Sequence, residues 1–263
     1  MDINKLFNLK GKVIVVTGGA GYLGKAISEA MIEAGATVYI VSSNEEKCKK
    51  LASDLSAGNF KLCRGMRLDI CDNSSIKNCF SKIVEETGKI DVLINNASFS
   101  VPSNIESMSE ENWLKGLDGT INGVFRCTKA VLPLMINQNG GVIINISSMY
   151  GSVSPNPDIY SDGVPNNPAN YGAGKGAINQ FTRYIACHYG KYGIRVNAVS
   201  PGPFPNEEVQ KNKKFIEQLK NKNPLKKIGK PEDLKGVVIF LASSASSYVT
   251  GENISVDGGW TAW

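Results

Sequence analysis

Tyr171 and Lys175 are the residues whose types and spacing most directly suggest chemistry. Positions four apart share one face of a helix, so a helix here would hold the phenol beside the ammonium. A phenol with a pKa of about 10 is a poor acid-base catalyst at neutral pH, but a nearby cation favours the phenolate and lowers that pKa. Of the nine tyrosines, only Tyr171 has a lysine four residues later. The same pair also occurs on ordinary solvated helix faces, so its meaning depends on the surrounding elements.

Strands and helices alternate along the predicted scaffold. Apolar, β-branched runs predict strands at 12–17, 37–41, 61–66, 90–94, 141–146, 194–199 and 253–256. Helical periodicity predicts helices at 22–34, 44–55, 73–87, 110–136, 170–189 and 232–242. This alternation implies right-handed βαβ crossovers and a parallel sheet with helices on both faces. Because no linker or repeat divides the chain, we predict one α/β domain over 1–263, a Rossmann-type doubly wound parallel sheet of about seven strands.

A glycine-rich turn follows the first predicted strand and opens a predicted helix. It reads Thr17-Gly18-Gly19-Ala20-Gly21-Tyr22-Leu23-Gly24. Glycines let the backbone approach a pyrophosphate, and the helix N-terminus supplies N–H donors and the positive end of a dipole. A G-x-G-x-x-G pattern in this position therefore predicts a dinucleotide site, with a flexible surface turn as the alternative.

Small polar residues follow the next four strands, at the edge where open α/β sheets bind ligands. Ser42-Ser43 provide neither the carboxylate typical of NAD selection nor an arginine for a 2′-phosphate. Because nothing there repels a phosphate, we expect NAD(P)(H) use that leans towards NADP(H). Asp69 either faces the adenine or is a solvated loop carboxylate. Asn95-Asn96 and Ser147-Ser148 are common loop residues when each pair is considered alone.

Composition excludes several function classes. With 42% hydrophobic and 20% charged residues, the 263-residue chain is typical of a globular domain. A net charge of +5 is too small and dispersed to indicate nucleic-acid binding, and a solvated amphipathic helix explains the lysine-rich segment 211–230. No apolar run approaches the ~18 residues that span a bilayer, and residues 1–12 lack a signal-peptide core. We therefore expect a cytoplasmic protein that binds neither membrane nor nucleic acid.

The six cysteines contain no Cys-x-x-Cys pair, and His188 is the only histidine. This pattern suits neither a zinc site nor a secreted disulfide framework. We predict reduced, mostly buried thiols, a surface or helix-capping role for His188, and no metal.

The glycine turn, Asn95-Asn96-Ala97, Ser147-Ser148, Tyr171-x-x-x-Lys175 and Pro201-Gly202 together resemble the ordered motifs of single-domain short-chain dehydrogenases/reductases, over nearly the whole chain. The resemblance implies that Tyr171 is the general acid/base, that Lys175 lowers its pKa and binds the nicotinamide ribose, and that Ser148 hydrogen-bonds the reacting oxygen. It also implies a homo-oligomer, tetramer or dimer, and a lid at about 203–230. The residues implied at the cofactor are Gly18, Gly21, Tyr22, Leu23, Ser42, Ser43, Asp69, Ile70, Asn96, Tyr171, Lys175 and Phe204.

Two departures from the family pattern concern the site. Single-domain members usually show T-G-x-x-x-G-x-G, which would place glycine at Tyr22; the spacing here is similar to that of the extended branch. The family's catalytic helix asparagine aligns with Thr120. Asn122 lies two positions away, a rotation of about 200° to the wrong helix face. A water-mediated relay through that asparagine is therefore not expected to carry over unchanged.

The segment 149–170, which we call the insert, is longer than in most family members. Its prolines are Pro155, Pro157, Pro165 and Pro168, and its polar residues include Asp158, Tyr160, Ser161, Asp162, Asn166 and Asn167. The long gap resembles that of gluconate 5-dehydrogenase-like enzymes of sugar-acid and polyol metabolism, and of enzymes that modify flagellin or surface sugars. We predict that the insert forms a wall of the pocket for a small polyhydroxylated substrate; an outer loop remote from the chemistry is the alternative.

The sequence is consistent with three alternative functions. The leading hypothesis is an oxidoreductase that interconverts a secondary alcohol and a ketone by hydride transfer on a sugar-like substrate. A 3-oxoacyl carrier-protein reductase shares the motifs, but its substrate needs a basic docking patch and an apolar channel. A non-catalytic cofactor-sensing protein is the third possibility, because fold does not fix function.

Overall fold

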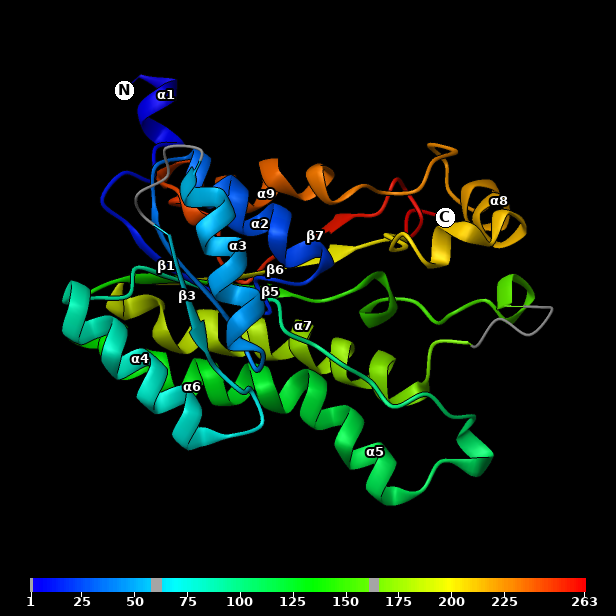
Figure 1. Cartoon of the computed structure of the whole chain (residues 1–263). Coiled ribbons are helices and arrows are strands. Elements are labelled where there is room, and N and C mark those ends of the chain that lie inside the picture. Colours follow the sequence, from blue (N-terminus) through cyan, green and yellow to red (C-terminus); the bar gives the residue numbers. More distant parts are fainter. Residues whose placement is uncertain (1, 58–62, 161–165) are drawn as a thin grey trace.

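Seven parallel strands form one sheet in the computed structural model, which describes residues 2–57, 63–160 and 166–263 (Figure 1). The strands are β1 (Val13–Thr17), β2 (Thr37–Ser42), β3 (Cys63–Arg67), β4 (Val92–Asn95), β5 (Gly141–Ile146), β6 (Ile194–Pro201) and β7 (Asn253–Val256). Their order is β3-β2-β1-β4-β5-β6-β7. β1 pairs with both β2 and β4, so strands are added first on one side of β1 and then on the other. Doubly wound folds bind ligands at the point where the strand order reverses in this way. The predicted fold class is confirmed.

Helices cover both faces of this sheet. On one face lie α2 (Tyr22–Glu33), α3 (Glu45–Ala57) and α9 (Lys235–Ala242), and on the other α4 (Asn73–Thr87), α6 (Gly123–Asn137) and α7 (Ala169–Tyr189) (Figure 1). The remaining α-helices are α1 (Ile3–Leu6), α5 (Glu110–Leu117) and α8 (Lys213–Asn221). Figure 1 places α8 and the C-terminus at the same end of the molecule.

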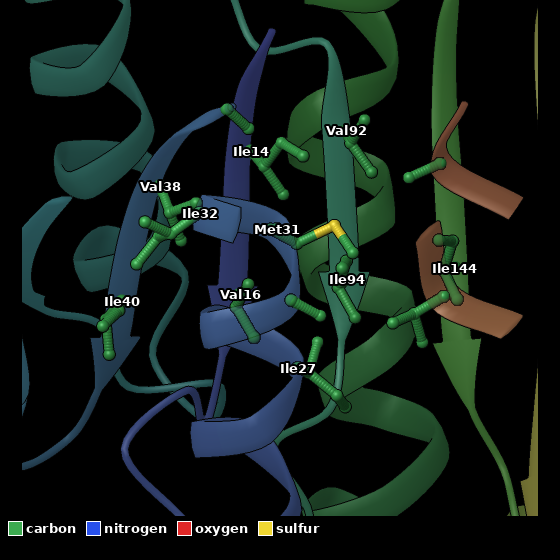
Figure 2. Packing of buried hydrophobic residues seen from close by; sticks show 14 of the residues in the cluster. Ile14, Val16, Ile27, Met31, Ile32, Val38, Ile40, Val92, Ile94 and Ile144 are labelled. Carbon is green, nitrogen blue, oxygen red and sulfur yellow. The ribbon is translucent and has the colours of Figure 1, made fainter. Parts of the chain in front are cut away.

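Period-two alternation along the strands builds two cores. Ile14 and Val16 point to the face covered by α2 and pack with Ile27 and Met31 (Figure 2). Val13, Val15 and other strand residues point the opposite way, onto α4, α6 and α7. Full burial of each large aliphatic side chain contributes roughly 1.5–3 kcal/mol, so both helix layers are held firmly against the sheet.

The bounds of α4 agree with the prediction, because capping residues mark both of its ends in the sequence. The Asp72 side chain accepts from the Ser74 N–H at the start of α4, and Gly88 ends that helix with φ 78°. The helical residues predicted at 110–136 are confirmed, but a π-helical turn (Asp118–Asn122) interrupts the α-helical hydrogen-bonding pattern between α5 and α6. The Thr120 hydroxyl donates to the Gly116 carbonyl at 2.9 Å and competes with the backbone for it. Positions 61 and 62 of the third predicted strand lie outside the described residues.

The cysteines are free, and four of the six are buried, as predicted. Burial raises the pKa of the Cys63, Cys79 and Cys127 thiols to about 12, which makes them unreactive. His188 is exposed, and its ring stacks on Tyr184 near the end of α7. Among the described residues, no helix is long and apolar enough to cross a membrane, and no three His, Cys, Asp or Glu side chains are grouped to hold a metal.

Candidate active site

The end of β5 and the start of α7 bring the three predicted catalytic residues together. Ser147 and Ser148 follow β5 directly, and Tyr171 and Lys175 lie in the first two turns of α7. The Ser147 hydroxyl donates to the Lys175 carbonyl at 3.0 Å, and the Lys175 Nζ donates to the Ile146 carbonyl at 2.8 Å. These two bonds fasten the helix to the carboxyl edge of the sheet, so Tyr171 is held next to Ser148.

Tyr171 is a neutral phenol in this arrangement. Burial raises its pKa, a hydrogen bond with Ser148 lowers it, and the neighbouring Tyr160 raises it. We expected Lys175 to lower this pKa, but the structure shows a net rise. The physical reason is desolvation, which penalises the phenolate more than the surrounding groups stabilise it.

Lys175 is almost fully buried, with 3% of its surface exposed. Its Nζ lies 5.5 Å from the centroid of the Tyr171 ring, within the range of a cation–π interaction. Burial alone lowers its pKa from 10.5 to about 7. The side chain therefore changes charge near neutral pH, and any anion that approaches it will favour the ammonium.

A cleft of about 510 Å³ opens at the glycine turn. It is lined by the nine residues predicted for the cofactor's adenosine and phosphates: Gly18, Gly21, Tyr22, Leu23, Ser42, Ser43, Asp69, Ile70 and Asn96. The structure thus gathers them in one place, while their contacts with a cofactor remain a prediction.

The glycine turn has the geometry that a pyrophosphate needs. A methyl on Gly18, whose φ is +61°, would lie 2.8 Å from the Ala97 Cα, and one on Gly24 would lie 2.1 Å from the Gly18 carbonyl oxygen. Gly21 caps α2 with no side-chain hydrogen bond, so the first-turn N–H groups have no competing side-chain acceptor. The Asn96 amide donates to the Thr17 and Gly18 carbonyls at 3.0 Å and braces the turn. The cleft and its turn therefore suit the adenosine and phosphates of a dinucleotide.

Lys47 lines the same cleft and was missed in the sequence analysis. It is exposed in the first turn of α3, where its backbone N–H donates to the Asn44 side chain at 2.9 Å. The helix predicted from residue 44 already placed a lysine beside Ser42-Ser43, and that adjacency was the available signal.

A second cleft, the reaction pocket, lies at Ser148 and Tyr171 and has a volume of about 560 Å³. Ser148, Tyr171 and the predicted Phe204 line it together with Tyr160 and Asn167 of the insert. Asp158 is exposed and lines neither this pocket nor the cofactor cleft, so its predicted place in the wall is not what the structure shows. Positions 161, 162 and 165 of the insert lie outside the described residues.

Three insert side chains, Tyr150, Tyr160 and Asn167, form a hydrogen-bonded group, which we call the tyrosine trio after its two tyrosines. The Tyr150 and Tyr160 hydroxyls lie 2.5 Å apart, and the Asn167 amide donates to the Tyr160 hydroxyl at 3.0 Å. Burial and Tyr160 raise the pKa of Tyr150, which keeps this phenol neutral. Because the trio borders the reaction pocket, it offers hydroxyl and amide groups near Tyr171.

The far wall of the reaction pocket comes from α8 and the segment before it. Val209, Asn212, Phe215 and Leu219 line it and make that side largely apolar. Asn212 caps α8 by accepting from the Phe215 N–H at 3.0 Å. The lid expected at about 203–230 contains this helix, but the sequence did not indicate which of its side chains line the pocket.

Thr120 and Asn122 lie on different sides of the π-helical turn. Thr120 is buried against α7, where a methyl on Gly174 would meet its Oγ1 at 2.0 Å. The Asn122 amide donates to the Asp118 carboxylate at 2.9 Å, which also pairs with Arg126. Asn122 is thus engaged in a separate polar cluster.

Comparison with known proteins places these features in context. A family model described as enoyl-(acyl carrier protein) reductase matches residues 19–261. A 3-oxoacyl-acyl-carrier-protein reductase of Thermotoga maritima is 36% identical over 95% of this chain and 98% of its own. A galactitol 2-dehydrogenase of Rhizobium johnstonii is 30% identical over the full length of both chains. The crystal structure of a gluconate 5-dehydrogenase from Burkholderia cenocepacia, in complex with NADP and tartrate, superposes with a TM-score of 0.91 at 28% identity and covers both chains completely.

Proposed function

This chain belongs to the short-chain dehydrogenase/reductase family, and from that premise we propose that it interconverts a secondary alcohol and a ketone on a sugar-like, polyhydroxylated substrate, using NADP(H) in preference to NAD(H). The observation that carries the proposal is the position of Ser148, Tyr171 and Lys175. Ser148 and Tyr171 line a pocket bordered by hydroxyl and amide groups, and Lys175 Nζ lies 5.5 Å from the Tyr171 ring centroid. A separate cleft at the glycine turn suits the adenosine and phosphates of a dinucleotide.

Ser148, Tyr171 and Lys175 each have a separate role in the acid-base chemistry. In the reducing direction, the Tyr171 hydroxyl gives its proton to the substrate oxygen, and in the oxidising direction it recovers that proton. Ser148, whose hydroxyl is near enough to Tyr171 to lower its pKa, holds the same oxygen in place. Protonated Lys175 stabilises the phenolate that forms when Tyr171 gives up its proton. A bound nicotinamide cofactor supplies or accepts the hydride.

Preference for NADP(H) rests on charge at the end of β2. Ser42 and Ser43 offer hydroxyls, and Lys47 adds a cation on the same side of the cleft. A 2′-phosphate there would meet hydrogen-bond donors and a positive charge. The gluconate 5-dehydrogenase relative was crystallised with NADP, which supports this choice.

The sugar-like substrate class rests on the tyrosine trio. Polar groups fixed at a pocket wall select substrates that can pair with them, because an analogue without hydroxyls leaves those groups unpaired. The names of the gluconate and galactitol dehydrogenase relatives support this class.

A second candidate function has its own support. The α8 side of the reaction pocket is apolar, and exposed lysines such as Lys213, Lys222 and Lys226 lie on or just after that helix. An acyl chain and an acidic carrier protein would suit such a surface. The Thermotoga relative, a 3-oxoacyl carrier-protein reductase, is consistent with it.

A homo-oligomer in the cytoplasm completes the proposal. Leu114, Phe125 and Tyr184, on α5, α6 and α7, are large apolar side chains that are 52%, 45% and 54% exposed. Burial of such side chains between copies of the chain would remove them from water.

A substrate panel tests the function. Aldonates, ketoses, polyols and acyl thioesters are each assayed with NADP(H) and NAD(H) by nicotinamide absorbance, with Tyr171→Phe as the inactive control. We expect the highest kcat/KM on an aldonate or polyol with NADP(H). Turnover confined to acyl thioesters would support the carrier-protein reductase, and cofactor binding without any turnover would support a sensing protein.

A further inference from the structure

A third and larger cleft, of about 1020 Å³, lies beside the reaction pocket. Its walls are the loop 102–107 before α5 and both ends of the insert, 150–155 and 166–169, and its floor is Gly172 and Ala173 of α7. Ser148, Tyr171 and the lid are not among its lining residues, so it is separate from the place where the reacting carbon must lie.

From this cleft we infer a second subsite, which binds the non-reacting part of an extended substrate and takes a neutral, hydroxyl-rich group such as a second sugar ring. The inference rests on the proposed function, because it assigns the far half of the same substrate. The reaction pocket alone already lies in the range of about 300–1,000 Å³ that suits a small-molecule site. A single sugar therefore does not need the larger cleft.

The tyrosine trio connects the two sites. Tyr150 and Asn167 line both the reaction pocket and the larger cleft, and Tyr160 links them through hydrogen bonds of 2.5 and 3.0 Å. A substrate whose carbonyl lies at Tyr171 can therefore cross a boundary made of phenols and an amide. Groups of this kind pair with the hydroxyls or the bridging oxygen of a glycoside.

The charge of the lining selects a neutral group. Of the described residues that line the cleft, Glu106 is the one that carries a charge, and none is a lysine or an arginine. A phosphate or sulfate would find no cation there and would be repelled by the carboxylate. The remaining polar lining consists of Tyr150, serines and asparagines, which donate and accept hydrogen bonds as sugars do.

Apolar and rigid parts of the wall also suit a sugar. Ile105 and Val153 line the cleft and are 66% and 36% exposed, so they can pack against the C–H face of a ring. Pro102, Pro155 and Pro168 fix the backbone of all three wall segments. Less conformational entropy is then lost when a ligand binds.

Ligand-observed NMR tests the subsite without relying on turnover. Maltobionate, an open-chain gluconate that carries one glucose ring, is added to the NADP-loaded full chain, and saturation transfer is measured separately for the gluconate chain and the glucose ring. We expect transfer to both parts in the wild type. Ser154→Trp, which fills the cleft from its exposed rim, should reduce transfer to the glucose ring by several-fold relative to the gluconate chain. Ser53→Trp, on the exposed side of α3, is the matched control and should leave the ratio unchanged.

Kinetics then separates the subsite from the proposed function. For the best substrate of the panel and its glycosylated form, Ser154→Trp should lower the ratio of extended to short kcat/KM at least ten-fold. Transfer confined to the gluconate chain, or a ratio unchanged by Ser154→Trp, would overturn the subsite while leaving the oxidoreductase assignment in place. No transfer to either part of maltobionate would also overturn it. Stronger binding of a phosphorylated sugar than of maltobionate would refute the neutral ligand class.

Discussion

Lys175→Met should change how the stability of this protein depends on pH. In the folded chain, burial lowers the pKa of Lys175 to about 7, whereas an unfolded lysine has a pKa of about 10.4. Methionine fills a similar volume and is neutral at every pH, so the variant removes this titration alone.

The sign and size of the effect follow from proton linkage. Below pH 7, Lys175 is protonated in both states, and the wild type bears the full cost of burying an ammonium. Between pH 7 and 10, the unfolded lysine keeps its proton and the folded one loses it, so stability rises with pH. The wild type should therefore gain ~1.4 kcal/mol per pH unit over the variant in this window, with an upper limit of ~5 kcal/mol.

Urea denaturation of the cofactor-free protein at pH 6, 7, 8 and 9 measures this difference directly. Lys77→Met is the control, because Lys77 is exposed on α4 and its removal should leave the slope unchanged. Titrations common to all three proteins cancel in the comparison. Parallel stability curves for the wild type and Lys175→Met from pH 7 to 9 would show that Lys175 keeps an ordinary pKa, and the desolvation argument would fail.

Three further predictions concern turnover, cofactor choice and assembly. Tyr171→Phe should preserve cofactor Kd, measured by nicotinamide fluorescence, while kcat falls by roughly 10²–10⁴ because the transferable proton is gone; near wild-type kcat would disprove its role. Ser42→Asp should move the Kd ratio towards NAD(H) by repelling a 2′-phosphate, and Lys47→Ala should weaken NADPH but not NADH; equal effects of Lys47→Ala on both cofactors would remove its phosphate contact. Light scattering at micromolar concentration should report a tetramer or dimer, and a monomer would contradict the exposed apolar faces as an interface.

The sheet and its ligand edge could be predicted from sequence because both depend on local patterns. Each strand is a short apolar run, and the residues that follow it must lie at the carboxyl edge of a parallel sheet. The positions of Ser148 and Asn96 followed from that rule, whereas Tyr171, at the start of α7, was identified by its spacing from Lys175 and by the family resemblance. The capped helix α4 was predicted at its observed bounds for a similar reason, since Asp72 and Gly88 mark its ends in the sequence.

The parts that were missed depend on contacts between distant segments. The π-helical turn lies where the Thr120 hydroxyl, packed against α7, competes for the Gly116 carbonyl. The hydrophobic periodicity of the sequence does not reveal such a side-chain contact. The net rise in the pKa of Tyr171 comes first from its own burial, which the spacing of Tyr171 and Lys175 does not reveal. The lid region was expected, but which side chains of α8 line the reaction pocket depends on how that helix packs at the sheet edge.

The contact between Gly174 and Thr120 restricts which amino acids can replace these two residues during evolution. A methyl on residue 174 would overlap the Thr120 hydroxyl, so any side chain at 174 requires a different residue or backbone at 120. Substitutions at these two positions are therefore coupled, and single mutational steps at residue 174 must pass through a disrupted junction between α7 and the π-helical turn. Related chains should accordingly vary the two sites together, with glycine at 174 retained wherever threonine is retained at 120.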